Sequence, residues 1–313
     1  MSPRPLLVVN PRSGGGATGR IMGELRAVVE RGLGPVDVVV TERPGHAPEL
    51  AERAAKDGRA LVVAVGGDGT FSDVVDGVLR AGAAHSTCVA LVGQGTGGDF
   101  RKTLCLEHRL DRYVEAIASG RTRALDVGRA RFSGRDGTAT TRHFVNILSA
   151  GMGGLVDDHV SRASRAFGGT MAYFFASARA LLETVPGRVR CTSWLAGAEE
   201  QRELESYMIA VCNGRYFGSG MHVAPMAKPD DGRFEVVSLS APSKLAFAVR
   251  AQSIYKGKHL EQPGTVTFGC DRIEMDLLDE RARKTFLLDV DGEPLGGLPL
   301  SIELLPRAIT MRA

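Results

Sequence analysis

A carboxylate, Asp68, lies among three glycines in the stretch VVAVGGDGTFSDVV, residues 62–75. Gly66, Gly67 and Gly69 allow positive φ angles and let a ligand approach the main-chain N–H groups. The hydrophobic residues that follow recur at helical spacing, so the turn leads into a helix N-terminus, which favours phosphate. Because a carboxylate repels a phosphate unless a cation lies between them, Asp68 predicts a metal–nucleotide complex. A strand-to-helix turn without a ligand is the alternative, but it leaves the three glycines unexplained.

A second glycine-rich turn follows one strand later, in LVGQGTGGDFRK, residues 91–102, and it also ends on an acid, Asp99. If the strands before both turns lie in one parallel sheet, Asp68 and Asp99 project from the same edge. Asp126, in ALDVG, is a candidate third carboxylate there. Three acids near phosphates would repel one another without Mg²⁺, which strengthens the prediction of a metal.

A third acidic segment, LLDVDGEPLGG, lies near the C-terminus at residues 287–297. Its dipeptide Asp291-Gly292 is a strong hairpin-turn signal. Asp291 or Glu293 could also act as a general base that takes a proton from an attacking hydroxyl. The turn and the base are compatible with each other, so both interpretations stay open.

Other motifs carry less information. The turn NPRSGGGATG, residues 10–19, contains a G-x-G-x-x-G pattern, but residues 11–13 delay the glycines past the strand, which makes it weak evidence for a dinucleotide site. The sequence GRDGT at 134–138 is interpreted as a loop, and Asp-Asp-His at 157–159 as a solvated turn rather than a zinc site. No serine has the context of a nucleophile elbow, so hydrolase chemistry is unsupported.

The elements that must position these residues change in type along the chain. Four apolar strands alternate with helical segments at the start, and they are predicted at 5–9, 36–40, 61–65 and 88–92. A further helix is predicted at about 109–119. This alternation predicts a parallel sheet covered on both faces, with ligands at the carboxyl ends of the strands.

From residue 129 onward, the sequence reads as successive strands separated by turns, which predicts an antiparallel sandwich or barrel. The strand-like segments are HFVNIL, GRVRCTSWL, SYMIAVCNG, GRFEVVSL, TVTFGC, RIEMDLL, TFLLDV and LSIELL. The stretch 162–183 has helical spacing instead, and a helix that covers the sheet is favoured over one that inserts into a membrane.

Composition bounds the kind of protein. The chain has 313 residues, of which 43% are hydrophobic, so it can bury a core. Its formal net charge is +3 and its basic residues are scattered, which argues against nucleic-acid binding. Five cysteines without CxxC spacing indicate a reduced, cytoplasmic setting. No apolar run reaches the roughly 20 residues of a transmembrane helix, so any membrane contact is expected to be peripheral.

Seven segments together resemble the soluble bacterial diacylglycerol kinase and lipid kinase family: NPRSGGG, TERPGHAPELA, GGDGTFSDVVDGV, GTGGDF, NGRYFGSGMHVAPMAKPDDGRFEV, IYKGKH and DVDGEPLGGLP. The resemblance runs from about residue 5 to 309. It implies an α/β nucleotide-binding domain similar to NAD kinase and phosphofructokinase over residues 1–128, and a β-sandwich lipid-substrate domain over 129–299. The last strand, near 300–313, is expected to return to the first domain.

The resemblance also implies site residues. The nucleotide site is expected at Asn10, Thr41, Gly66, Gly67, Asp68, Gly69, Thr70, Phe71, Ser72 and Thr96. The acidic network around Mg²⁺ is expected at Asp68, Asp99 and Asp126, and the catalytic base at Asp291, with Glu293 as the other candidate. A structural metal in KPDDGRF would use the Asp231 carboxylate and the main-chain carbonyls of Lys228 and Arg233, and a plain turn is the alternative there.

The chain departs from the family pattern in the first loop, which lacks a lysine and has Arg12 or Arg20 to supply positive charge, and at three further places. Gly93 replaces a proline, Gly98 replaces an asparagine, and Ser72-Asp73 replaces an Asn-Glu pair. These changes leave open which lipid is the acceptor.

The implied activity is ATP- and Mg²⁺-dependent phosphorylation of a lipid hydroxyl, most simply of diacylglycerol to phosphatidic acid, at a membrane surface. The alternatives are an enzyme similar to NAD kinase and a non-catalytic lipid or nucleotide sensor. A homodimer is plausible from the resemblance alone.

Overall fold

The computed structural model describes residues 3–95, 97–162 and 169–313, without the side chains of 161–175. The chain forms two compact units, the first made of residues 1–127 and 306–313 and the second of residues 128–305. It passes from one unit to the other within two strands, β5 (Thr122–Gly134) and β15 (Glu293–Arg312). Among the described residues, no helix is long and apolar enough to cross a membrane.

The first unit is built on a parallel sheet, as the strand–helix alternation predicts. Its strands run in the order β2-β1-β3-β4, and the end of β15 adds to β4 through the pair Met311 and Val89. The bounds are β1 Leu6–Val9, β2 Asp37–Val40, β3 Leu61–Gly66 and β4 Cys88–Gly93. The helices are η1 Ser13–Gly16, α1 Ala17–Arg20, α2 Met22–Leu33, α3 His46–Lys56, α4 Asp68–Arg80, α5 Asp99–Thr103 and α6 Leu110–Ala118.

The strands β1, β3 and β4 are apolar and buried on both faces of this sheet, whereas the edge strand β2 begins with Asp37 and is only partly buried. Val63 and Val65 pack in one core with residues of α2 and α6, while the alternate residues Val62 and Ala64 are equally buried on the other face. On that other face α3 and α4 pack against each other. The carboxyl ends of the strands are therefore the part of the sheet left for a ligand.

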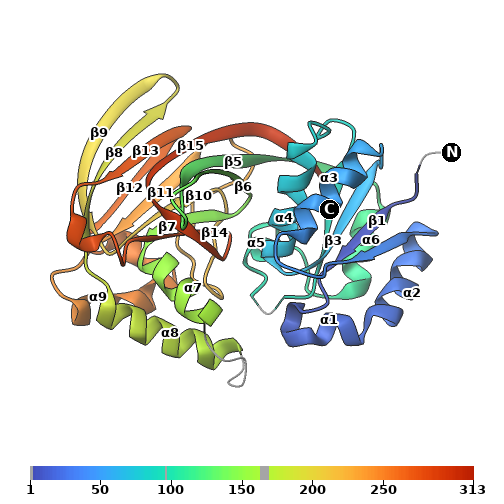
Figure 1. Ribbon diagram of the computed structural model, residues 1–313, viewed down its shortest axis with the longest axis horizontal. Helices are drawn as coiled ribbons and strands as arrows, with labels where there is room; N and C mark the ends of the chain where they lie inside the picture. Colours follow the sequence, from blue (N-terminus) through green and yellow to red (C-terminus); the bar gives the residue numbers. More distant parts are fainter. Residues whose placement is uncertain (1–2, 96, 163–168) are drawn as a thin grey trace. The chain divides into compact units, whose positions relative to one another are not determined.

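The second unit is an antiparallel β-structure with one helical layer (Figure 1). One run of strands has the order β12-β11-β10-β7-β14-β15, and β13, β8 and β9 continue from β15. The strand bounds are β6 Ala139–Phe144, β7 Ile147–Gly151, β8 Gly187–Leu195, β9 Ala198–Ser206, β10 Met208–Cys212, β11 Phe234–Leu239, β12 Thr265–Cys270, β13 Arg272–Leu277 and β14 Leu287–Val290.

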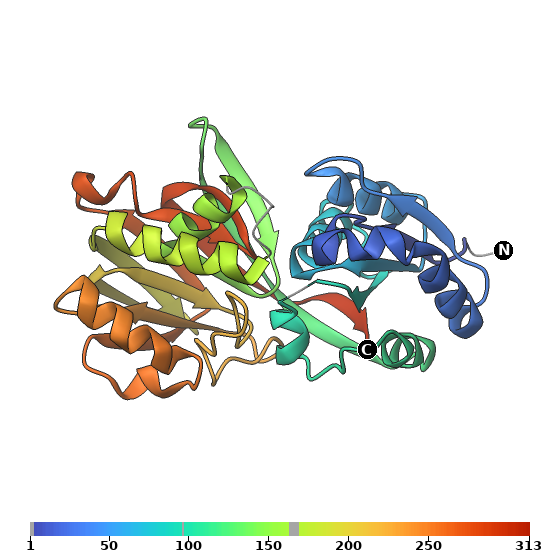
Figure 2. The same ribbon diagram turned by 90° about the horizontal axis from the view of Figure 1, so that it is seen from below.

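Helices α7, α8 and α9 of the second unit lie on one side of its strands (Figures 1 and 2). Strand β10 shows why its sequence is apolar throughout: Ile209 and Val211 enter the sandwich core, whereas Met208 and Ala210 pack with residues of the helical layer. The helices are α7 Met152–Arg162, α8 Gly169–Glu183, α9 Lys244–Ile254, η3 Lys258–Glu261 and η4 Glu280–Ala282.

Three features differ from the sequence-based expectations. Strand β9 was not predicted, because its sequence AEEQRELES is polar on both faces; it is an edge strand that pairs only with β8. The predicted strand HFVNIL is interrupted at residues 145–146, where the backbone turns its N–H groups to a side chain. Residues 157–159 are helical, in α7, rather than a turn.

Candidate functional site

The junction of β3 and α4 presents a helix N-terminus at the carboxyl edge of the parallel sheet. Helix α4 begins at Asp68, with Gly67 at its N-cap position and no side chain capping it. The N–H of Phe71 donates to the carbonyl of Gly67 at 3.2 Å. The N–H groups of residues 68–70 precede this bond, so they point out of the helix end, where an anion is stabilised.

The glycines of this junction serve close approach rather than positive φ, which corrects the sequence-based reason for them. Gly66, Gly67 and Gly69 all have negative or extended φ. A Cβ on Gly66 would lie 2.4 Å from Thr70 Oγ1, and a Cβ on Gly95 would lie 2.6 Å from the Cα of Gly67. The two glycine-rich turns therefore touch backbone to backbone, and the contact admits only glycine at position 95.

The N-terminal glycines join the same cluster. Gly14, Gly15 and Gly16 have φ of 60°, 65° and 85°, a left-handed run open only to glycine without strain. A Cβ on Gly14 would lie 2.6 Å from the Gln94 carbonyl oxygen. Three glycine-rich turns thus converge in the first unit. From the sequence alone, Gly14 is part of a weak motif, Gly95 counts only as one glycine of the second turn, and Gln94 is not singled out.

The remaining residues predicted for the nucleotide site lie in different surroundings: some lie at the glycine-rich turns and others are buried or extend a strand. Asn10 donates from Nδ2 to Thr70 Oγ1 at 3.2 Å, which ties the first turn to α4. The hydroxyl of Ser72 is buried and has no hydrogen-bond partner among the described residues. Phe71 is a core residue that stacks on Phe100, and the N–H of Thr41 extends the pairing of β2 by donating to Val9. Thr96 lies outside the described residues.

The three predicted metal-network acids each hold backbone or side-chain groups of the first unit. Asp68 Oδ2 accepts hydrogen bonds from the N–H groups of Asp99, at 2.6 Å, and Phe100, at 3.3 Å. Asp99 Oδ1 accepts from Lys102 Nζ at 2.8 Å. Asp126 is fully buried and accepts from the N–H of Arg307 at 2.7 Å, where β15 returns to this unit. Asp68 is thus the link between the first two turns.

Within the described part of the chain, no group of three or more His, Cys, Asp or Glu side chains could by itself hold a metal ion. Mg²⁺ in phosphoryl-transfer sites usually takes one or two carboxylates, several waters and the phosphates of the substrate. A carboxylate at the helix N-terminus, as Asp68 is, fits such an ion when a nucleotide supplies the other oxygens.

The predicted departures from the family pattern have structural counterparts. A Cβ on Gly93 would lie 2.5 Å from the hydroxyl of Tyr113, whose pKa burial raises to about 12. Gly98 has a φ of 57°, and a Cβ there would lie 2.9 Å from Arg101 Nε, a buried atom without a hydrogen-bond partner among the described residues. Tyr113 and Arg101 therefore pack against the two glycines at these positions.

In the second unit, Asp291 occupies the hairpin turn between β14 and β15, as predicted. Its carboxylate accepts N–H bonds from Val145, Asn146 and Ile147 at 2.8, 3.0 and 2.9 Å. These three donors fix the orientation of the carboxylate. The Glu293 side chain is 40% exposed, and its Oε2 lies 3.3 Å from Arg142 Nη2.

A buried acid pair lies next to this turn. Asp289 Oδ1 accepts from the N–H of Gly292 at 2.7 Å and hydrogen-bonds through its carboxyl group to Asp157 on α7. Burial raises the pKa of Asp157 to about 7 and, with the nearby charge of Asp157, raises the pKa of Asp289 well above its ordinary value. The expectation of a solvated turn at 157–159 is therefore wrong, because α7 packs directly on β14: a Cβ on Gly154 would lie 2.4 Å from the Leu287 carbonyl oxygen.

The predicted structural-metal turn precedes β11. Asp231 Oδ1 accepts from the N–H of Arg233 at 3.4 Å, and the Arg233 guanidinium lies 3.9 Å from Asp231 and close to Glu235. The contacts of Asp231 with the N–H and guanidinium of Arg233 thus hold the turn together from within. A metal bound by Asp231 and the carbonyls of Lys228 and Arg233 stays a prediction.

Two known families match the chain. The one described as a diacylglycerol kinase catalytic domain matches residues 4–130, and the one described as a YegS C-terminal NAD kinase beta sandwich-like domain matches residues 146–313. A protein of Yersinia pestis (strain Pestoides F) named "Probable lipid kinase YegS-like" is 24% identical over 316 aligned residues, which cover 99% of this chain and 97% of that protein.

Two solved structures share the fold. A crystal structure of a diacylglycerol kinase from Bacillus anthracis str. Sterne matches with a TM-score of 0.71 and 21% identity, covering 99% of this chain and 96% of that one. Yeast NADH kinase complexed with NADH matches with a TM-score of 0.51 and 11% identity, covering 99% and 83%. The parallel-sheet domain followed by a β-sandwich is thus a fold that this chain shares with both enzymes.

Proposed function

Because the chain belongs to the YegS-like, diacylglycerol kinase-like family of lipid kinases, we propose that it transfers the γ-phosphoryl group of ATP to the hydroxyl of a membrane lipid. Diacylglycerol, giving phosphatidic acid, is the acceptor we propose first, and a monoacylglycerol or a sphingoid base is a related one. The observation that carries the proposal is the convergence of three glycine-rich turns on the N-terminus of α4.

The turns supply what phosphoryl transfer needs most, which is positioning and neutralisation of charge. Main-chain N–H groups at the start of α4 would bind phosphate oxygens, because no side chain caps that helix end. Asn10 and Thr70 bond to each other beside this end and would hold the first turn in place. When Mg²⁺ is bound, it offsets the negative charge that builds up on the phosphates; Asp68, with Asp99 and Asp126, would hold it.

The proton of the acceptor hydroxyl needs a base, and we assign this role to the turn at Asp291 in the second unit. Three backbone N–H groups aim its carboxylate in one direction, and a base of fixed orientation is the kind that general catalysis requires. Glu293, paired with Arg142, is the other candidate.

The test is an acceptor screen with γ-labelled ATP and Mg²⁺ on the purified full chain. Diacylglycerol, monoacylglycerol and sphingosine are offered in mixed micelles, and NAD is offered in solution. Label in phosphatidic acid supports the proposal, and label in another lipid keeps the lipid kinase but changes the acceptor. Label in NADP would contradict it in favour of an NAD kinase, and ATP binding without any transfer would favour a sensor.

A further inference from the structure

Helix α9 and the segment around it have an unusual composition for a surface element. The helix, KLAFAVRAQSI, carries apolar side chains on both faces: Phe247 and Ile254 are buried, while Leu245 and Val249 point outward. An amphipathic helix on a globular surface ordinarily places polar residues outward. The outward face of α9 therefore carries apolar side chains that do not pack against the core.

Among the described residues, the four most exposed large apolar side chains lie at the end of α8, on α9 and directly after α9. Leu182 and Leu245 are both 76% exposed, Val249 is 68% exposed and Tyr255 is 51% exposed. Lys244 Nζ donates to the Leu182 carbonyl oxygen at 2.5 Å, which joins the two helix ends. We call these four residues the α8–α9 patch. Large apolar side chains this exposed, on neighbouring helix ends, favour a contact with a partner or a membrane.

The charged side chains of α9 and of the segment after it, up to residue 260, have one sign, while Glu183, next to Leu182 on α8, is paired with Arg179. Residues 240–260 contain four cationic side chains, Lys244, Arg250, Lys256 and Lys258, and no aspartate or glutamate. Basic side chains flanking exposed apolar ones are the composition of a surface that lies on anionic lipid. A contact between two copies of the patch would instead bring like charges together.

An apolar cavity of about 150 Å³ lies beneath the patch, between α7, α8, α9 and β10. Three methionines line it, Met152, Met208 and Met221, together with Ala251 of α9. Tyr255 both lines the cavity and is half exposed, so the cavity reaches the surface at the patch. An apolar cavity of this size takes a ligand of about six carbons, and flexible thioethers adapt their packing to an incoming chain.

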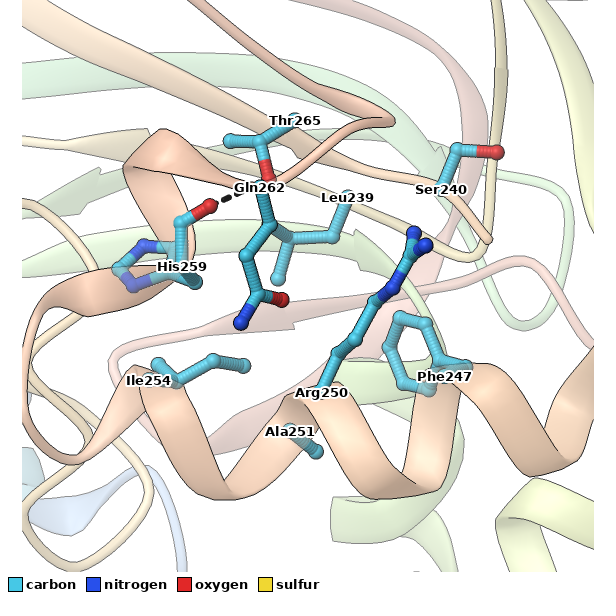
Figure 3. Close-up of a pocket in the computed structure, with 9 residues that line it drawn as sticks. All are labelled: Leu239, Ser240, Phe247, Arg250, Ala251, Ile254, His259, Gln262 and Thr265. Atoms are coloured by element: carbon cyan, nitrogen blue, oxygen red, sulfur yellow. Dashed lines mark hydrogen bonds between the residues drawn. The ribbon is translucent and has the colours of Figure 1, made fainter. Parts of the chain in front are cut away.

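A second pocket lies between α9 and η3, and it is much smaller than the methionine-lined cavity. There α9 leaves a pocket of only about 20 Å³, room for about one water, and Arg250 extends into it and donates to the Pro263 carbonyl (Figure 3). A hydrocarbon chain fits only the larger, methionine-lined cavity.

We propose that the α8–α9 patch docks on an anionic lipid bilayer and that the cavity beneath it receives the end of one hydrocarbon chain of the lipid. That the bound lipid is the acceptor of the phosphoryl group rests on the proposed function. Binding to vesicles, however, needs neither ATP nor turnover, so the surface is testable by itself.

The experiment is sedimentation of the full chain with vesicles of phosphatidylcholine, alone or with 30 mol% phosphatidylglycerol. The wild type should bind the anionic vesicles more tightly, and binding should weaken as salt rises. Leu245→Ser/Val249→Ser should lower the affinity at least about tenfold. Lys256→Gln/Lys258→Gln should lower it about fivefold for each lysine, on anionic vesicles only.

A matched control comes from two exposed apolar residues elsewhere in the second unit. Leu195 and Val266 are 39% and 38% exposed, and Leu195→Ser/Val266→Ser should bind vesicles as the wild type does. ATP affinity and circular dichroism should be the same in all variants. Equal vesicle binding by the patch and control variants would overturn the proposal, as would a patch variant that changes only the oligomeric state in light scattering.

The cavity is tested with cis-parinaric acid, a fluorescent single-chain lipid, below its micellar concentration. Ala251→Leu fills the cavity and should weaken parinaric acid binding at least about fivefold. Ala246→Leu, on the same helix but away from the cavity, should leave it unchanged. Equal binding by both variants, or no binding by the wild type, would refute the chain-binding part.

Discussion

Replacing Gly95 by alanine should separate the first two glycine-rich turns. The new Cβ would lie 2.6 Å from the Gly67 Cα, closer than such atoms come in proteins. Because the obstacle is backbone, no side chain can rotate away, and one turn must shift. Overpacking of this kind costs about 1–3 kcal/mol. If a phosphate is bound by both turns, ATP affinity should fall about 5- to 150-fold.

Gly97 provides the matched control in the same turn. Its Cβ would lie 3.7 Å from Asp99 Oδ2, an ordinary contact, and neither Gly95 nor Gly97 has a positive φ. Isothermal titration with Mg·ATP should show Gly97→Ala close to the wild type and Gly95→Ala clearly weaker, with circular dichroism unchanged in both. If Gly95→Ala binds ATP as tightly as the control, the nucleotide phosphates do not lie at this contact.

Three further predictions concern other parts of the molecule. Because the raised pKa of Asp157 lets the folded chain keep a proton that the unfolded chain loses, the free energy of unfolding should fall from about pH 4 to about pH 7. Asp157→Asn should flatten that slope in urea titrations, and an unchanged slope would exclude the pair as its source. Gly98→Asn should weaken ATP binding, because its side chain would meet the Arg101 guanidinium, and adding Arg101→Ala should restore part of the affinity. The two substitutions should be coupled by about 1 kcal/mol; if their effects on ATP affinity are additive, the two side chains do not compete for the same space. Asp291→Asn should lower kcat at least about 100-fold and Glu293→Gln less, whereas the reverse order would assign the base to Glu293.

The strands and the main glycine junction could be predicted from the sequence, because apolar runs and glycines are local signals. The four strands of the first unit agree with their predicted ranges to within a residue or two. The reason for the glycines could not be predicted. Gly95 must be glycine because its backbone meets that of Gly67, and that contact joins residues 28 positions apart in the sequence.

The burial of charged residues could also not be predicted from the sequence. Asp157 and Asp158 look like a polar turn until α7 packs on β14, where Asp157 meets Asp289 and Asp158 pairs with Arg135 at 2.6 Å. Likewise, nothing in HFVNIL indicates that its centre donates three N–H groups to Asp291. Partners distant in sequence determine both arrangements.

The most direct test of the central claim measures label transfer from ATP to diacylglycerol by the wild type and by Asp68→Asn. Asp68 links the two glycine-rich turns and is the acid proposed to bring Mg²⁺ to the phosphates. We expect labelled phosphatidic acid from the wild type, a loss of at least about 100-fold in the variant, and a folded variant by circular dichroism. Equal transfer by the two proteins would contradict the assignment of this junction as the phosphoryl-transfer site.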